Sequence, residues 1–177
     1  MGQIRSLLRG IAHYSGAGPA EVLRGLDEAI VGMHTDTLAT ALVARFERPT
    51  AHGHGWRRLR WANAGHPPPI LIDPDGAVRL LGGSSGDLLL GVDPDVARSE
   101  PVVPVAPGTT LFLYTDGLVE RRDRIIDEGL ARLAEQLDEL ANRPLEELCN
   151  AVLDGMLQTT PQDDVALVAL RLSTSAA

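Results

Sequence analysis

The stretch Thr109-Thr110-Leu111-Phe112-Leu113-Tyr114-Thr115-Asp116-Gly117 sets a strongly apolar run directly before an acidic residue and a glycine. A run of this length and composition, which follows the turn pair Pro107-Gly108, predicts a buried β-strand over residues 109–115. Asp116 is then the first residue after the strand. A carboxylate at a strand end is a candidate for chemistry.

Downstream of Asp116 the sequence predicts two helices and a returning strand. Leucines at helical spacing predict a helix over about 126–140, and a second helix starts at Pro144 and carries Met156 near its end. The apolar run 165–172 predicts a last strand, and Asp163 and Asp164 precede it. A helical crossover of this kind could return the last strand beside 109–115 and bring Asp116 and Asp163 together.

In the upstream half of the chain, apolar residues recur first at helical spacing and then in the patterns of β-strands. Residues 57–63 alternate as a half-buried strand does, and Asp73-Pro74-Asp75-Gly76 predicts the turn of a hairpin. The predicted elements are helices over 1–13 and 19–33, a buried strand over 37–46, strands over 57–63, 70–72 and 77–81, and a strand over 97–103. Strands in a block, then helices, then one returning strand predict an α+β fold with helices on antiparallel sheets. We expect one domain over residues 1–177.

Composition limits the classes of function. The chain has 177 residues and a formal net charge of −8, which argues against a nucleic-acid-binding surface because phosphate binding needs clustered cations. The single cysteine, Cys149, excludes an internal disulfide and is interpreted as a small buried residue in a helix. No apolar run approaches the ~18 residues of a membrane helix, so no membrane association and a cytoplasmic location are expected.

Asp116, Asp163 and Asp164 are the candidate site residues that the pattern itself supplies. Several carboxylates in one place repel one another unless a cation neutralises them, and ligation by oxygen alone favours Mg²⁺ or Mn²⁺. The competing interpretation is that Asp116-Gly117 is a common turn dipeptide and that Asp163 is a cap before the strand. Spacing alone leaves both interpretations open.

Histidines and arginines give weaker signals. His66, in Asn63-Ala64-Gly65-His66, could be a ligand or a general acid, but a hydrogen-bonding role that fixes the turn is the favoured interpretation. His52-Gly53-His54 is interpreted as a solvated loop tip. The run 121–124 is interpreted as a solvated helix entrance.

Four motifs together resemble a known family. They are Leu113-Tyr114-Thr115-Asp116-Gly117-Leu118-Val119-Glu120, Asn63-Ala64-Gly65-His66-Pro67-Pro68, Leu90-Gly91-Val92 and Asp163-Asp164-Val165-Ala166-Leu167. In this order and spacing, over essentially the whole chain, they closely resemble the SpoIIE-type branch of the bacterial metal-dependent serine/threonine protein phosphatases (the PPM family, relatives of the type 2C enzymes). The resemblance implies an antiparallel β-sandwich flanked by helices and two Mn²⁺ or Mg²⁺ ions.

The resemblance also implies a reaction and site residues. A metal-activated water would hydrolyse phosphoserine or phosphothreonine on a regulatory protein, commonly an anti-anti-sigma factor. By motif match, Asp116 and Asp163 would be metal ligands. Gly117 would allow a close approach of the backbone. Gly117, Asp164 and His66 would be the candidates to contact and orient the metal ligands without binding the metal themselves.

The sequence departs from the family pattern at its start. The family carries a Gly-Asp-Val-x-Gly-His-Gly motif before its first long helix, and its Asp bridges both metals; this sequence lacks it. We therefore expect a chain truncated at its N-terminus relative to the family, without its first strands, and holding at most part of one ion's shell. The alternative function is a catalytically silent remnant that binds a regulatory protein or pairs with itself as a homodimer.

Overall fold

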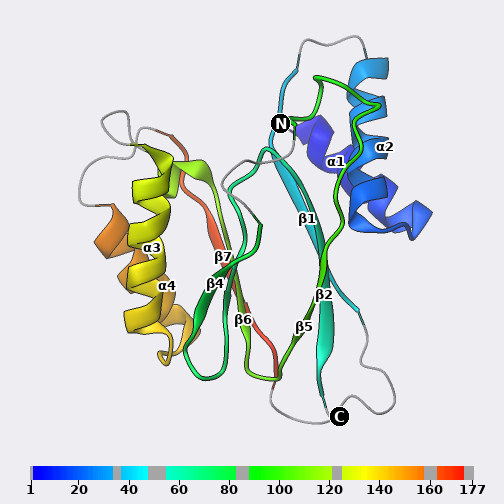
Figure 1. Cartoon of the computed structure of the whole chain (residues 1–177). Helices are drawn as coiled ribbons and strands as arrows, with labels where there is room; N and C mark the ends of the chain where they lie inside the picture. The colour runs from blue at the N-terminus through cyan, green and yellow to red at the C-terminus, as the bar shows by residue number, and fades with distance from the viewer. Residues whose placement is uncertain are drawn as a thin grey trace. The chain divides into compact units, whose positions relative to one another are not determined.

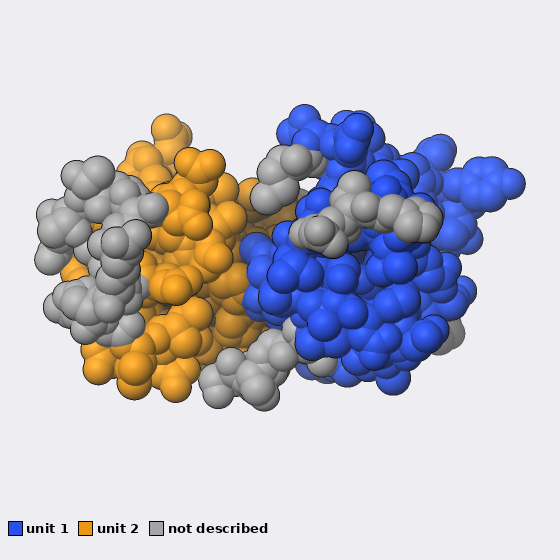
Figure 2. Space-filling view, turned by 90° about the horizontal axis from the view of Figure 1, so that it is seen from above, with its two compact units in different colours: residues 1–53, 57–66, 85–104 blue, residues 54–56, 67–84, 105–177 orange. Residues whose placement is uncertain are grey.

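The computed structural model describes residues 2–33, 37–47, 55–82, 88–120, 125–157 and 163–173. The chain divides into two compact units, which Figure 2 distinguishes by colour. The first unit comprises residues 1–53, 57–66 and 85–104, and the second comprises residues 54–56, 67–84 and 105–177. Each unit has its own sheet and its own helices.

In the first unit, two helices accompany a three-stranded sheet. The elements are α1 (Gly2–Ser15), α2 (Pro19–Gly32), β1 (Ala41–Glu47), β2 (Arg57–Ala64) and β5 (Val102–Val105), with strand order β1-β2-β5. β1 and β2 are antiparallel, in a register that sets Ala41 opposite Ala64. Leu23, Leu26 and Ile30 of α2 are fully buried in one core with alanines of β2 because they recur on one helix face.

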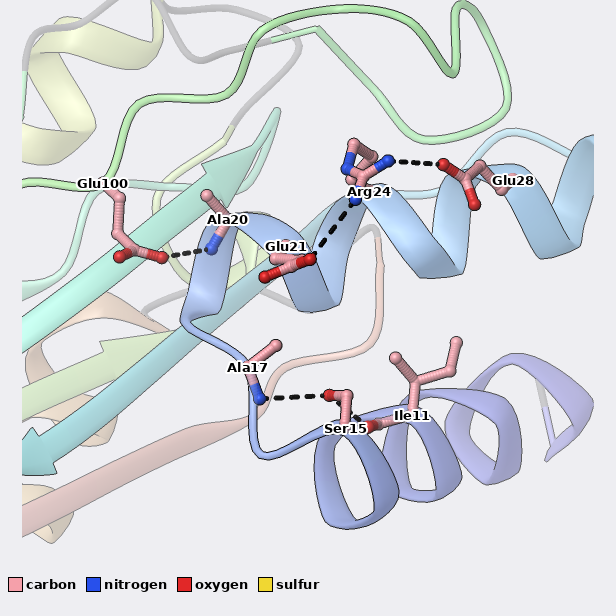
Figure 3. Close-up of polar contacts among 8 residues, drawn as sticks. All are labelled: Ile11, Ser15, Ala17, Ala20, Glu21, Arg24, Glu28 and Glu100. Carbon is pink, nitrogen blue, oxygen red and sulfur yellow. Dashed lines mark hydrogen bonds and ion pairs between the residues drawn. The ribbon is translucent and has the colours of Figure 1, made fainter.

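A distant carboxylate stabilises the start of α2. Pro19 occupies the first turn, where its missing N–H costs no hydrogen bond. Gly18, which precedes it, makes no side-chain cap. Instead, the Glu100 carboxylate accepts a hydrogen bond of 2.7 Å from the backbone N–H of Ala20, as Figure 3 shows. The negative charge also suits the positive end of the helix dipole.

In the second unit, the four strands are β3 (Ile70–Ile72), β4 (Val78–Leu80), β6 (Thr110–Tyr114) and β7 (Leu167–Arg171). Their order is β4-β3-β6-β7, and all neighbours are antiparallel. The predicted hairpin forms as β3-β4. Gly76 supplies the positive φ of +94° at its turn and donates its N–H to the Asp73 carbonyl at 2.9 Å.

Helices α3 (Ile126–Leu140) and α4 (Leu145–Met156) lie side by side against this sheet (Figure 1). The leucines of α3, at intervals of three and four residues, form one apolar face, as the sequence predicts, and α4 buries Leu148, Val152 and Met156. The short 3-10 helix η1 (Asp116–Leu118) follows β6. The fully or nearly fully buried core of this unit is Ile70, Ile72, Phe112, Tyr114, Leu118, Val119, Leu130, Leu133, Leu137, Ala141, Leu148, Val152 and Met156.

The predicted α+β class with helices on antiparallel sheets is confirmed, but three details of the prediction are wrong. The strand expected over 97–103 is β5, Val102–Val105, because Arg98 and Glu100 bond to α2 and hold the preceding backbone outside the sheet. The strand expected over 37–46 begins at Ala41 and is half-buried throughout, since β1 is an edge strand. Cys149 is half-buried rather than buried.

The expectation of one domain over residues 1–177 stays a prediction. Across the described residues, no helix has both the length and the apolar character needed to cross a membrane.

Candidate functional site

The ends of β6 and β7 meet at one corner of the second unit. In the antiparallel ladder Tyr114 lies opposite Leu167, so the residues that follow β6 adjoin those that precede β7. The backbone N–H of Thr115 extends the ladder by donating to the Ala166 carbonyl at 2.9 Å. Asp116 on one segment and Asp163 on the other are thereby carried to the same corner, although two helices separate them in the sequence.

Asp116 is held by a turn of its own backbone. It is the first residue of η1, and its carbonyl oxygen accepts hydrogen bonds from the N–H groups of Val119 and Glu120, at 2.8 and 2.7 Å. Its side-chain Oδ1 accepts the N–H of Gly117 at 2.9 Å. One carboxylate oxygen is therefore oriented by the main chain, and Oδ2 has no hydrogen-bond partner among the described residues.

Gly117 lies where the two segments are closest. A β-carbon built on this residue would lie 2.7 Å from the carbonyl oxygen of Asp164 and 3.0 Å from that of Asp163. The first distance is shorter than a side-chain carbon and a backbone oxygen tolerate, and the second is tight, so a larger residue would require the backbone to shift. The resemblance implies a close approach of the backbone at Gly117, and the structure has this geometry.

Asp163 and Asp164 are both exposed. Oδ1 of Asp163 accepts the N–H of Asp164 at 2.7 Å, which orients this carboxylate in the same way as that of Asp116. Asp164 takes part through its backbone carbonyl, which accepts the hydroxyl of Thr115 at 3.0 Å. The contacts of Asp164 to residues 115–117 and 163 thus come from its main chain, whereas Asp116 and Asp163 each have one carboxylate oxygen bound to a backbone N–H.

The donor chemistry of the corner fits a hard cation. Both side chains offer carboxylate oxygen, the ligand type that Mg²⁺ and Mn²⁺ prefer. Within the described ranges, no group of three or more His, Cys, Asp and Glu side chains could hold a metal ion. Asp116 and Asp163 are therefore two candidate ligands, which would make up only part of an octahedral shell.

His66 belongs to the first unit, whereas the carboxylate corner belongs to the second. Asn63 clamps the turn that contains it: Oδ1 accepts the His66 N–H at 2.8 Å, and Nδ2 donates to the His66 carbonyl at 2.7 Å. Nδ1 of the His66 ring lies 3.3 Å from the hydroxyl of Thr40. These contacts agree with the turn-fixing interpretation. His52, His54 and the run 121–124 lie outside the described residues.

A shallow hollow of about 260 Å³ lies elsewhere in the second unit. Its walls are mostly apolar and include Pro68, Leu80 and Leu130. Neither Asp116 nor Asp163 lines it. The hollow and the carboxylate corner are therefore separate features of this unit.

Sequence reasoning missed two polar residues that organise the structure. Thr115 was assigned only as the end of a strand, although its hydroxyl bonds to the segment before β7. Asp27 was not singled out, although it lies on the apolar face of α2 and is completely buried beside Arg98. Its position four residues after Leu23 and three before Ile30 was the available signal, because a charge there must be paired.

Both the sequence and the fold are similar to those of known proteins. A family model described as stage II sporulation protein E (SpoIIE) matches residues 1–173. The chain is similar to the RsbU and RsbW domains of Rv1364c from Mycobacterium tuberculosis, with 26% identity and a TM-score of 0.83 over 100% of this chain. It spans 48% of that chain, about half its length.

Two further solved structures share the fold. The SiaA-PP2C domain of Pseudomonas aeruginosa is 22% identical with a TM-score of 0.71, over 96% of this chain and 68% of that one. RsbX in complex with magnesium is 19% identical with a TM-score of 0.68, over 97% of this chain and 72% of that one. At these identities the likeness concerns the fold alone.

Proposed function

We infer that this chain, which belongs to the stage II sporulation protein E (SpoIIE) family of type 2C-like bacterial phosphatases, hydrolyses phosphoserine or phosphothreonine on a regulatory protein. The observation that carries the inference is the corner at which η1 and the segment before β7 touch. There, the backbone of Gly117, next to Asp116, lies against the backbone of Asp163 and Asp164, which supports a shared site for the two carboxylates.

Asp116 and Asp163 are the residues that would hold Mg²⁺ or Mn²⁺. The family is expected to use two ions, and RsbX, which is similar in fold, was crystallised with magnesium. When bound, such an ion supplies Lewis acidity toward the phosphoryl oxygens and lowers the pKa of a water that attacks phosphorus.

The chain's own residues hold the two carboxylates in place. The Gly117 and Asp164 N–H groups each fix one oxygen of an adjacent carboxylate, at 2.9 and 2.7 Å. Both Oδ2 atoms have no hydrogen-bond partner among the described residues and remain available to a cation. The main chain thus orients each ligand before a cation arrives, which lowers the entropy lost on binding.

The proposed substrate is a phosphorylated anti-anti-sigma factor or a similar regulatory protein. The likeness to a chain with RsbU and RsbW domains supports this class. The net charge of −8 argues against nucleic acid as a partner. We propose that the reaction takes place in the cytoplasm, where such regulators act. We also propose that the chain associates with itself as a homodimer.

A second candidate function is a catalytically silent module that binds the regulatory protein. The two-carboxylate donor set favours it, because within the described residues no third His, Cys, Asp or Glu completes a metal-binding group. Two carboxylates bind a divalent cation more weakly than a larger set, since fewer protein ligands replace its water.

Hydrolysis of p-nitrophenyl phosphate and of a phosphoserine peptide with and without Mn²⁺ separates the two functions. The variants are Asp116→Asn and Asp163→Asn, and the control is Asp154→Asn, which removes one exposed carboxylate from α4. Mn²⁺-dependent turnover that is lost in both site variants and kept in the control supports the phosphatase. Mn²⁺ binding by calorimetry without turnover favours the silent module. Turnover that survives both site substitutions contradicts the assignment of Asp116 and Asp163.

A further inference from the structure

The hydroxyl of Thr115 joins the two segments that carry the site carboxylates. Its Oγ1 donates a hydrogen bond of 3.0 Å to the carbonyl oxygen of Asp164, which is 49 positions away in the sequence. The same oxygen accepts the backbone N–H of Ala166 at 2.9 Å. Because a hydroxyl has one proton and two lone pairs, this side chain can make both bonds at the same time.

These two bonds continue the sheet ladder beyond its last backbone pair. The final main-chain bond runs from the Thr115 N–H to the Ala166 carbonyl at 2.9 Å. In a continued ladder the Thr115 carbonyl would accept the Ala166 N–H, and the Gly117 N–H would donate to the Asp164 carbonyl. Because η1 begins at Asp116, the Thr115 carbonyl instead accepts the Leu118 N–H at 3.1 Å, and the Gly117 N–H donates to Asp116 Oδ1. The Thr115 side chain therefore supplies the donor and the acceptor that the backbone no longer offers.

The position of Thr115 gives these bonds a consequence for the site. Asp116 directly follows Thr115, and Asp163 directly precedes the residue whose carbonyl the hydroxyl binds. Gly117 allows the two segments to touch but exerts no attraction of its own. The Thr115 hydroxyl is thus a polar side-chain contact that opposes their separation, in addition to the apolar packing of Val165 on the core.

We propose that Thr115 is a positioning residue of the carboxylate corner, and that its hydroxyl sets the spacing of Asp116 and Asp163 for one divalent cation. The proposal rests on the proposed function of that corner. It assigns Thr115 no contact with substrate or cation. Residues that orient metal ligands typically change metal affinity by about 10- to 100-fold when they are removed, which sets the expected size of the effect.

The test compares Thr115→Val, which keeps the shape without the hydroxyl, with Thr115→Ser, which keeps the hydroxyl. Thr109→Val is the matched control, because Thr109 lies just before the other end of β6 and its buried Oγ1 has no partner among the described residues. Mn²⁺ affinity is measured by calorimetry on the full chain. Protection of the Ala166 amide is measured by hydrogen exchange without metal, together with the thermal unfolding midpoint.

We expect Thr115→Val to bind Mn²⁺ at least about 10-fold more weakly and to lose protection at Ala166, while Thr115→Ser and Thr109→Val stay close to the wild type. Unchanged Mn²⁺ affinity in a folded Thr115→Val variant would overturn the proposal. An equal loss of Mn²⁺ affinity in Thr115→Ser would also overturn the proposal, because the hydroxyl would then not be the cause of the tighter binding in the wild type.

Failure of the proposed function gives a different result. If the wild type itself binds no Mn²⁺, the assigned function of the corner fails, and hydrogen exchange decides what Thr115 does. Protection at Ala166 that is lost in Thr115→Val and kept in Thr115→Ser supports the positioning of the segments by the hydroxyl. Equal protection of the Ala166 amide in all variants would show that the Thr115 hydroxyl does not position the segments either.

Discussion

The carboxylate of Asp27 on α2 and the guanidinium of Arg98 form an ion pair that water hardly reaches, with side chains 0% and 1% exposed. The other Asp27 oxygen accepts the N–H of Gly91 at 2.6 Å, and Arg98 Nη1 donates to the Leu88 carbonyl at 2.8 Å. The pair thus fastens residues 88–98 to α2 within the first unit.

Removal of one member of this pair should be costly. Arg98→Met leaves the Asp27 carboxylate buried without its partner, and we expect the free energy of unfolding to fall by about 3–5 kcal/mol. Addition of Asp27→Asn should restore part of this loss, because asparagine keeps an acceptor for Gly91 without the charge. Arg24→Met is the control, since Arg24 pairs with Glu28 on the surface and should cost below about 1 kcal/mol. Urea unfolding measures all three, and equal losses for Arg98→Met and Arg24→Met would contradict the prediction.

Gly117→Ala tests whether close contact of the two segments is required. The new β-carbon would lie 2.7 Å from the Asp164 carbonyl oxygen, so the backbone must shift. We expect a loss of about 1–3 kcal/mol in unfolding free energy and weaker Mn²⁺ binding. Gly10→Ala in α1 is the matched control, because nothing lies within 4 Å of its β-carbon position. That change should stabilise the helix by about 0.5–1 kcal/mol. A Gly117→Ala variant as stable as the wild type would show that the segments separate at no cost.

Tyr114 is a buried phenol whose hydroxyl has no hydrogen-bond partner among the described residues. Burial raises the pKa of its phenol well above the usual value of 10. The native state therefore keeps this proton at a pH where the unfolded chain loses it, and stability should fall as the pH rises above 10.

Tyr114→Phe should remove that alkaline loss. At neutral pH the variant should be at least as stable as the wild type, with a gain of up to about 1 kcal/mol, because an unpaired buried hydroxyl is removed. Tyr14→Phe is the control, since Tyr14 is 95% exposed. Urea unfolding at several alkaline pH values measures the effect. A clear destabilisation by Tyr114→Phe at neutral pH would mean that the hydroxyl has a partner.

Glu47 should contribute stability only above acidic pH. The pKa of its carboxyl is lowered from the usual 4.5, chiefly by the hydrogen bond from Arg60 and, to a smaller extent, by the charge of Arg58. A lowered pKa in the folded state gives stability that is fully present above pH 4.5 and is lost as the pH falls through the folded value. The stability difference between wild type and Glu47→Gln should therefore shrink on acidification. Glu135→Gln controls for the change in net charge, and a difference that grows at low pH would have the wrong sign.

Local patterns were enough for most of the elements. The apolar run before Asp116 predicted β6, and the turn 73–76 predicted a hairpin that forms in the structure. The predicted helices over 1–13 and 19–33 correspond to α1 and α2. These signals depend on neighbours a few residues apart, so the sequence contains them directly. The strand predicted at 97–103 was misplaced because its backbone follows side-chain bonds to α2, and such bonds leave no periodic pattern.

The motifs alone support a prediction of Asp116 and Asp163 as cation ligands, because both residues stand at predicted strand ends and a glycine follows Asp116. No local pattern shows that residues 115–117 and 163–166 touch, that the Thr115 hydroxyl joins them, or that Asp27 is paired with Arg98. The spacing of apolar residues along the chain indicates which face of one helix or strand is buried, and it carries no information on partners far away in the sequence. Hydrogen bonds between residues 49 or 71 positions apart depend instead on how the whole chain packs.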